Sequence, residues 1–199
     1  MTRAISQNSI FDAIKKGVKT AFKDYKGMSG DNYGIPESYF QAKIADNIAK
    51  LDGNFYVTLE DMYVDILKNA GAHGKAISFL DNPTQRADII VWWGTKKGGS
   101  EVSSGPRFIV EVKRLFQVEP LIKDRDKIQN VLRFQDSLQA GILVGIHPWM
   151  KNEDTIENTS GRHSEELDAD LYDYISFKNG EDDYENTIYS GAGIFLFKK

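Results

Sequence analysis

The chain has 199 residues, of which 41% are hydrophobic and 27% charged, a composition typical of a folded domain. It contains no cysteine, which excludes disulfides and cysteine-ligated zinc, and no apolar run of 18 residues, which argues against a membrane-spanning helix. The amino-terminal residues lack the apolar segment of a signal peptide. We therefore expect a cytoplasmic protein in which residues 1–199 form one domain.

Charge is distributed unevenly around the net value of −4. Residues 151–190 contain twelve acidic and three basic residues, whereas residues 1–150 contain 20 basic and 17 acidic residues. The first 150 residues are thus slightly basic, and the acidic segment is expected to be a solvated face.

The first part of the chain favours helices and one strand. Residues 9–23 carry apolar residues at every fourth position, which predicts a helix with one buried face. A second helix is expected from near Pro36 to Leu51, because proline suits the first helical turn and apolar residues again recur at helical spacing. A strand over 54–60 and a short helix over 61–72 follow.

The middle of the chain predicts the centre of a sheet. Residues 87–93 and 107–113 are apolar segments that we expect to be strands, joined by a flexible Gly/Ser-rich connection over 94–106. A helix over 121–139 and a buried strand over 141–146 come next. A proline two residues beyond that strand is expected to terminate it.

The last part of the chain is polar at first and apolar at its end. Residues 151–170 are expected to form a polar and partly mobile excursion. Strands are expected over 171–178 and 191–197.

Two of the expected strands carry charged residues in the midst of apolar ones. Side chains alternate faces along a strand, so Glu111 and Lys113 point the same way while their apolar neighbours face the core. Asp88 lies at the start of the adjacent strand, where a carboxylate must be solvated, paired or metal-bound. Two carboxylates and a lysine are the groups that a magnesium-dependent phosphodiesterase needs.

The triplet at 111–113 also has an ordinary explanation, because Glu and Lys alternate on many exposed strand faces. The context favours a functional site, since residues 89–93 are apolar without a break and predict a strand that is covered on both faces. Both interpretations remain open at the level of sequence.

The arrangement resembles the PD-(D/E)XK nuclease superfamily, which includes restriction endonucleases and many repair and phage nucleases. The resemblance rests on Ala87-Asp88, on Glu111-Val112-Lys113 and on the order of elements over residues 36–147. Ala87 stands where the name of the superfamily has proline, at a position that varies. The resemblance implies an α/β fold with a restriction-endonuclease-like core, in which helices flank a mixed sheet of four or more strands in the order α-β-β-β-α-β. Residues 1–35 would then be an N-terminal helical extension, and residues 148–199 an acidic C-terminal region with added strands.

The resemblance also implies roles for individual residues. Asp88, Glu111 and the backbone carbonyl of Val112 would bind Mg²⁺ or Mn²⁺, and Lys113 would orient or activate the attacking water. Glu37, on the apolar stripe at the start of the second helix, has an ordinary role in stabilising the helix N-terminus. Many members of the superfamily carry an acidic residue on this helix that is aimed at the metal, which makes Glu37 a further candidate.

The implied function is a metal-dependent DNA endonuclease of restriction, phage or repair type. Restriction enzymes of this size commonly cut as dimers, so a homodimer is plausible on the same ground. Gln135 is a minor site candidate, and loops 24–36 and 94–106 are candidates for specificity.

Two alternatives from other functional classes stay open. One is a catalytically silent module that keeps the nuclease fold and binds nucleic acid, because a fold does not determine a function. The other is an interaction or immunity protein that uses the acidic segment 151–190 to occupy a basic partner. The sequence does not distinguish DNA from RNA as the partner.

Overall fold

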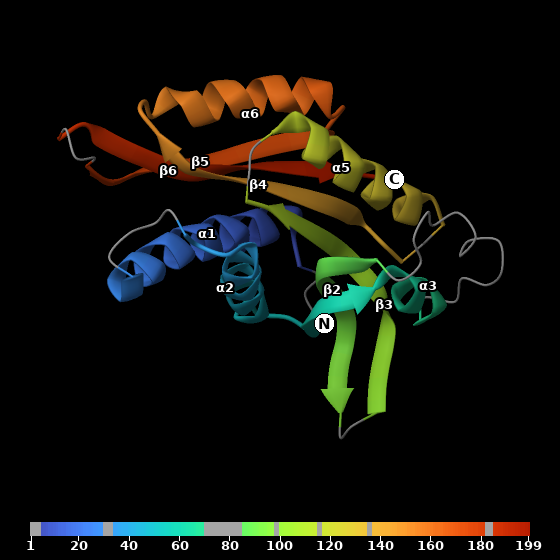
Figure 1. The fold of residues 1–199 in the computed structure, drawn as a ribbon. Coiled ribbons are helices and arrows are strands. Elements are labelled where there is room, and N and C mark those ends of the chain that lie inside the picture. The colour runs from blue at the N-terminus through green and yellow to red at the C-terminus, as the bar shows by residue number, and fades with distance from the viewer. Residues whose placement is uncertain are drawn as a thin grey trace.

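The computed structural model of the chain describes residues 5–29, 34–69, 85–97, 100–114, 117–134, 137–181 and 185–199. Within these ranges the chain forms one six-stranded mixed sheet and five helices (Figure 1). The strands are β1 (Phe55–Met62), β2 (Arg86–Lys97), β3 (Ser100–Lys113), β4 (Ala140–Met150), β5 (Leu171–Glu181) and β6 (Thr187–Phe197). The helices are α1 (Gln7–Ser29), α2 (Glu37–Ala49), α3 (Tyr63–Asn69), α5 (Val118–Phe134) and α6 (Asp154–Glu166).

The strand order across the sheet is β1-β2-β3-β4-β6-β5. The central pair β3 and β4 is parallel, with α5 as the connection between them, and the other neighbouring pairs are antiparallel. A parallel pair needs such a crossover, whereas antiparallel neighbours can be joined by short turns. The expectation of an α/β fold with a mixed sheet is thus confirmed.

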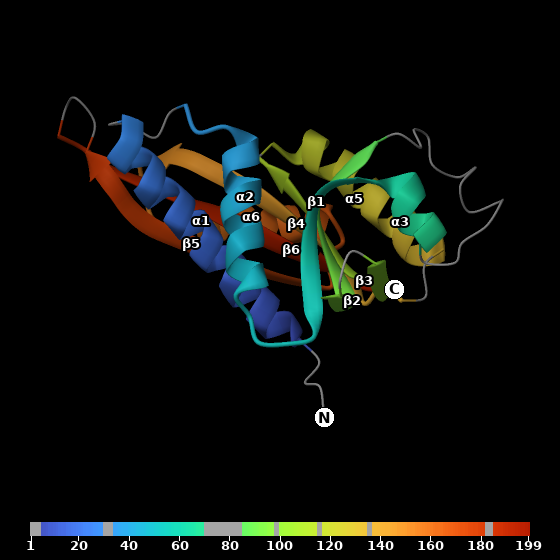
Figure 2. The ribbon, with the colours of Figure 1, turned by 90° about the horizontal axis from the view of Figure 1, so that it is seen from below.

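Helices α1 and α2 pack together on one face of the sheet (Figure 2). The predicted stripe of α1 is buried completely, with Ile10, Ile14, Val18 and Phe22 in one core that includes the inward residues of β3 and β4. Gly17 lies against the backbone of α2, where a Cβ atom would come within 2.6 Å of the Cα atom of Ile44. The absence of a side chain at Gly17 therefore permits the close approach of the two helices.

The opposite face of the sheet is covered by α3, α5 and α6 (Figure 1). The buried side of α5 packs into a second core through Leu121, Ile128, Val131 and Leu132. The sheet thus separates two apolar cores, and its central strands are buried on both faces, as the unbroken apolar run of β2 predicted.

Two expectations about the sheet were wrong. The connection 94–106 is not a flexible loop, because its described residues 94–97 and 100–106 continue β2 and β3 as a long hairpin. Gly94 and Gly105 have positive φ values of 123° and 110°, and the ladder shifts register beside Gly94. These glycines therefore accommodate a bulge within a ribbon and do not end the strands.

Strand β4 does not stop at Ile146, as predicted, but continues to Met150. The ladder with β6 shifts register between His147 and Met150, which lets Pro148 lie where no backbone N–H is needed.

No helix was predicted in the polar segment 151–170, which contains helix α6. Its buried side consists of Ile156 together with the polar residues Ser160, His163 and Ser164, so it shows little apolar periodicity. The helix predicted over 121–139 is observed as α5, which begins three residues earlier and ends at Phe134. No helix in the described ranges has the length and apolar character that crossing a bilayer requires.

Candidate functional site

The carboxyl end of β3 carries the two charged residues of the predicted triplet. Val110 and Val112 point into the core under α1 and α2, whereas Glu111 and Lys113 point to the face that α5 covers. The alternation of side chains along the strand therefore holds as predicted. Glu111 is only 2% exposed, and the side chain of Lys113 is 27% exposed.

Asp88 lies on β2 beside this end of β3. Ile89 pairs with Val110, so Asp88 and Glu111 follow as neighbours across the two strands. The backbone N–H of Val112 donates a hydrogen bond of 2.7 Å to Oδ2 of Asp88, which is 8% exposed. This bond ties the carboxylate of one strand to the backbone of the other and fixes its position.

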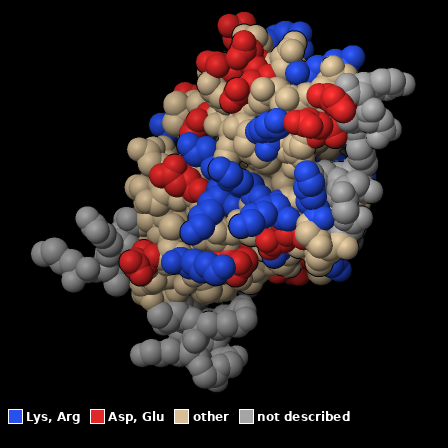
Figure 3. Space-filling model, turned by 90° about the vertical axis from the view of Figure 1, so that its left-hand side faces the viewer, with Lys and Arg blue, Asp and Glu red and all other residues tan. Residues whose placement is uncertain are grey.

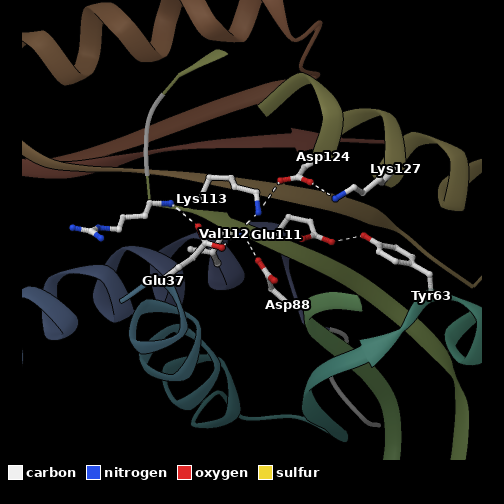
Figure 4. Close-up of polar contacts among 9 residues, drawn as sticks. Glu37, Tyr63, Asp88, Glu111, Val112, Lys113, Asp124 and Lys127 are labelled. Carbon is white, nitrogen blue, oxygen red and sulfur yellow. Dashed lines mark hydrogen bonds and ion pairs between the residues drawn. The ribbon is translucent and has the colours of Figure 1, made fainter. Parts of the chain in front are cut away.

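Glu37 reaches the same place from the first turn of α2 (Figure 4). Its Oε1 lies 3.5 Å from Nζ of Lys113, and its Oε2 accepts a hydrogen bond of 2.9 Å from the backbone N–H of Arg114. The structure thus brings together the four side chains proposed from the sequence, although they come from three separate elements. Gln135 lies outside the described residues.

The site also contains three residues that were not selected from the sequence, namely Asp124, Lys127 and Tyr63. Asp124 on α5 is 2% exposed and forms ion pairs with Lys113 and Lys127. The hydroxyl of Tyr63, the first residue of α3, donates a hydrogen bond to Oε1 of Glu111 (Figure 4).

Asp124 was not selected from the sequence, although it is buried on α5. A signal existed in the helical period, because Asp124 lies three residues after buried Leu121 and four before buried Ile128. A carboxylate on the buried stripe of a helix requires a partner, and Lys113 provides one. For Tyr63 we find no comparable sequence signal.

Burial governs the protonation of the two acidic side chains on the sheet. Burial raises the pKa of Glu111 well above its usual range, and the nearby carboxylate of Asp88 raises it further. Burial also raises the pKa of Asp88 to about 6, although the Val112 N–H and Lys113 favour its ionised form. Negative charge is thus disfavoured here in the absence of further positive charge.

The protonation of Lys113 is governed by its charged neighbours more than by its burial. Burial alone would lower the pKa of its ammonium group, but the carboxylates of Asp124 and Glu37 outweigh burial and raise that pKa. The side chain therefore remains protonated throughout the physiological pH range.

The charge and chemistry of these residues fit a divalent cation. Four carboxylates (Glu37, Asp88, Glu111 and Asp124) face two ammonium groups (Lys113 and Lys127), and magnesium prefers oxygen ligands of this kind. Within the described part of the chain, no three His, Asp or Glu side chains are grouped closely enough to form a protein-only metal cage. Magnesium sites commonly use one or two carboxylates and keep several waters, so Asp88 and Glu111 are sufficient.

Comparisons of the chain with protein-family models, with curated proteins and with solved structures found no match.

Proposed function

We propose that this chain is a metal-dependent nuclease of the PD-(D/E)XK type that hydrolyses phosphodiester bonds in DNA. The observation that supports the proposal is the position of Lys113 beside Asp88 and Glu111 at the end of a buried strand. Exposed alternating charges would not be 2% and 8% accessible, as Glu111 and Asp88 are. Burying two carboxylates on adjacent strands is costly, and a cation that binds between them would offset that cost.

Asp88, Glu111 and the carbonyl of Val112 would hold Mg²⁺ or Mn²⁺ in this proposal. A divalent ion at such a site supplies Lewis-acid polarisation of a phosphoryl oxygen and lowers the pKa of bound water. Tyr63 donates to one oxygen of Glu111 and the Val112 N–H to one oxygen of Asp88, so both carboxylates are oriented before any ligand arrives.

Lys113 would act as a fixed positive charge and not as a proton acceptor. Its pKa is raised by Asp124 and Glu37, so the ammonium group has no tendency to lose its proton near pH 7. A protonated lysine can donate hydrogen bonds to the attacking water and stabilise charge that develops on the phosphate. Glu37 and Asp124 contact it from two helices and hold it in position.

The test is cleavage of supercoiled plasmid and of single-stranded DNA by the purified protein, with Mg²⁺, with Mn²⁺ and with chelator. We expect metal-dependent nicking that is lost in Lys113→Ala and retained in Lys68→Ala, a control at an exposed lysine that forms only a 3.9 Å pair with Asp65. DNA binding without cleavage would favour the catalytically silent module.

Absence of both binding and cleavage, with RNA also tested, would contradict the proposal. That result would favour a protein partner for the acidic segment 151–190.

A further inference from the structure

Helix α1 presents a row of lysines on its solvent side. Lys16, Lys19, Lys23 and Lys26 are exposed, and their spacing of three or four residues places them on one face of the helix. The row lies opposite the buried stripe and extends over residues 16–26, or about 15 Å of helix.

Three of these lysines differ from the other lysines nearby. Lys15 pairs with Asp173 and Lys43 pairs with Asp24. In the described part of the chain no carboxylate pairs with Lys16, Lys19 or Lys23, and Lys26 donates to a backbone carbonyl, that of Asn179. Their positive charge is thus not neutralised locally, in a chain whose net charge is −4.

The carboxyl-terminal part of α1 contacts the first turns of α2. The ring of Tyr25 on α1 packs against that of Tyr39 on α2 with centroids 5.5 Å apart, and Tyr39 is two residues from Glu37. Figure 3 shows Lys and Arg side chains gathered in the middle of the face where α1 ends, with acidic side chains around them. Positive charge is therefore gathered on this face of the molecule.

We propose that the lysine row of α1 binds the phosphate backbone of the DNA substrate. This inference rests on the proposed nuclease function. A DNA strand carries one negative charge per roughly 3.4 Å, so ammonium groups about one helical turn apart can contact successive or alternate phosphates. Such contacts carry no sequence information and contribute affinity that decreases with salt.

A lipid surface is the less suitable anionic partner. Helices that bind membranes insert an apolar face next to their basic face. The apolar face of α1 is occupied, because Ile10, Ile14, Val18 and Phe22 are all 0% exposed in the core. The row therefore offers charge without apolar side chains that could enter a bilayer.

The test compares two triple variants of the full chain with the same net charge. One carries Lys16→Gln, Lys19→Gln and Lys23→Gln, and the control carries Lys50→Gln, Lys68→Gln and Lys198→Gln at other exposed positions. Binding of a fluorescent DNA duplex is measured by anisotropy in chelator over a range of salt concentrations, with vesicles containing phosphatidylserine as a second ligand. Circular dichroism checks that both variants are folded.

We expect the α1 variant to bind DNA at least ~10-fold more weakly than wild type at low salt. The slope of log affinity against log salt concentration should become less steep by roughly 2–3. The control variant should bind within about twofold of wild type. Equal weakening in both variants, or an unchanged slope in the α1 variant, would refute the lysine row while leaving the nuclease proposal intact. Failure of the wild type to bind or cleave any nucleic acid would overturn both, and binding of wild type to vesicles alone would overturn the choice of DNA.

Discussion

The ammonium group of Lys113 on β3 lies 3.2 Å from Oδ2 of Asp124 on α5. Asp124 is 2% exposed, and its other oxygen pairs with Lys127 one helical turn later. The pair connects the strand that carries the candidate site to the helix that covers it. The position of the lysine thus depends on an aspartate outside the motif that first identified it.

Replacing Asp124→Asn tests this dependence. We expect kcat for DNA cleavage to decrease ~10–100-fold with little change in KM, because Lys113 loses the group that positions it while the sheet carboxylates remain. The free energy of unfolding should decrease by about 1–3 kcal/mol, since two partly buried lysines lose a charged partner. Steady-state kinetics and denaturant titration measure the two effects.

Asp126→Asn is the matched control on the same helix. Asp126 is 55% exposed, and among the described residues its ion pair is with the neighbouring Arg125, so its loss should change stability by at most about 0.5 kcal/mol. Equal kinetic effects of the two substitutions would contradict a positioning role for Asp124.

Asp88→Asn should stabilise the metal-free protein at neutral pH. The pKa of Asp88 is about 6 in the folded state against 3.8 for the free side chain, so ionisation costs stability as pH rises from 3.8 to 6. The asparagine can still accept the Val112 N–H bond, and the gain at pH 7 should reach up to about 3 kcal/mol. At pH 3.5 both side chains are neutral, and the gain should vanish.

Adding Mg²⁺ distinguishes metal binding by Asp88 from the effect of its buried charge on stability. The unfolding temperature of the wild type should rise with Mg²⁺ and fall back when chelator is added, because a ligand of the folded state stabilises it. Asp88→Asn should show a much smaller rise. An equal rise in both proteins would mean that Asp88 does not hold the metal.

The pH dependence of stability should also show the effect of His147. Burial, together with the nearby His163, lowers the pKa of His147 to about 4. The neutral imidazole therefore contributes stability above pH 6.5, and this contribution is lost as pH decreases from 6.5 towards 4. The full difference corresponds to roughly 3 kcal/mol.

His147→Gln should remove this dependence. Between pH 7 and pH 4.5 the wild type should lose more stability than the variant, and the difference should be most of roughly 3 kcal/mol. Denaturant titrations at the two pH values measure it. Parallel pH profiles would show that His147 is not buried in its neutral form.

The contact between α1 and α2 predicts opposite effects at two glycines of one helix. In Gly17→Ala the new Cβ atom would lie 2.6 Å from the Cα atom of Ile44, so the helices must separate, at a cost of about 1–3 kcal/mol. In Gly27→Ala nothing lies within 4 Å, and the better helix former should stabilise by up to about 1 kcal/mol. Thermal unfolding of both variants measures the difference, and a stable Gly17→Ala would mean that the helices are not in close contact.

Local periodicity sufficed for the elements whose residues alternate clearly. The four-residue spacing in α1 and the alternation along β3 each depend only on near neighbours in the chain, so they were predictable. Helix α6 was not, because its buried side consists largely of serine and histidine, and β4 was cut short because a bulge that accommodates Pro148 depends on the partner strand β6.

That Glu111 and Lys113 share one face of a strand follows from their spacing in the chain, because a strand repeats every two residues. Only the tertiary structure decided that Glu37 and Asp124 reach Lys113 from two helices on opposite faces of the sheet. Contacts between residues 76 and 11 positions away from Lys113 depend on how helices pack, and packing is a property of the whole core. The shifted pKa values arise in the same way, since they follow from burial and from charges that distant parts of the chain bring together.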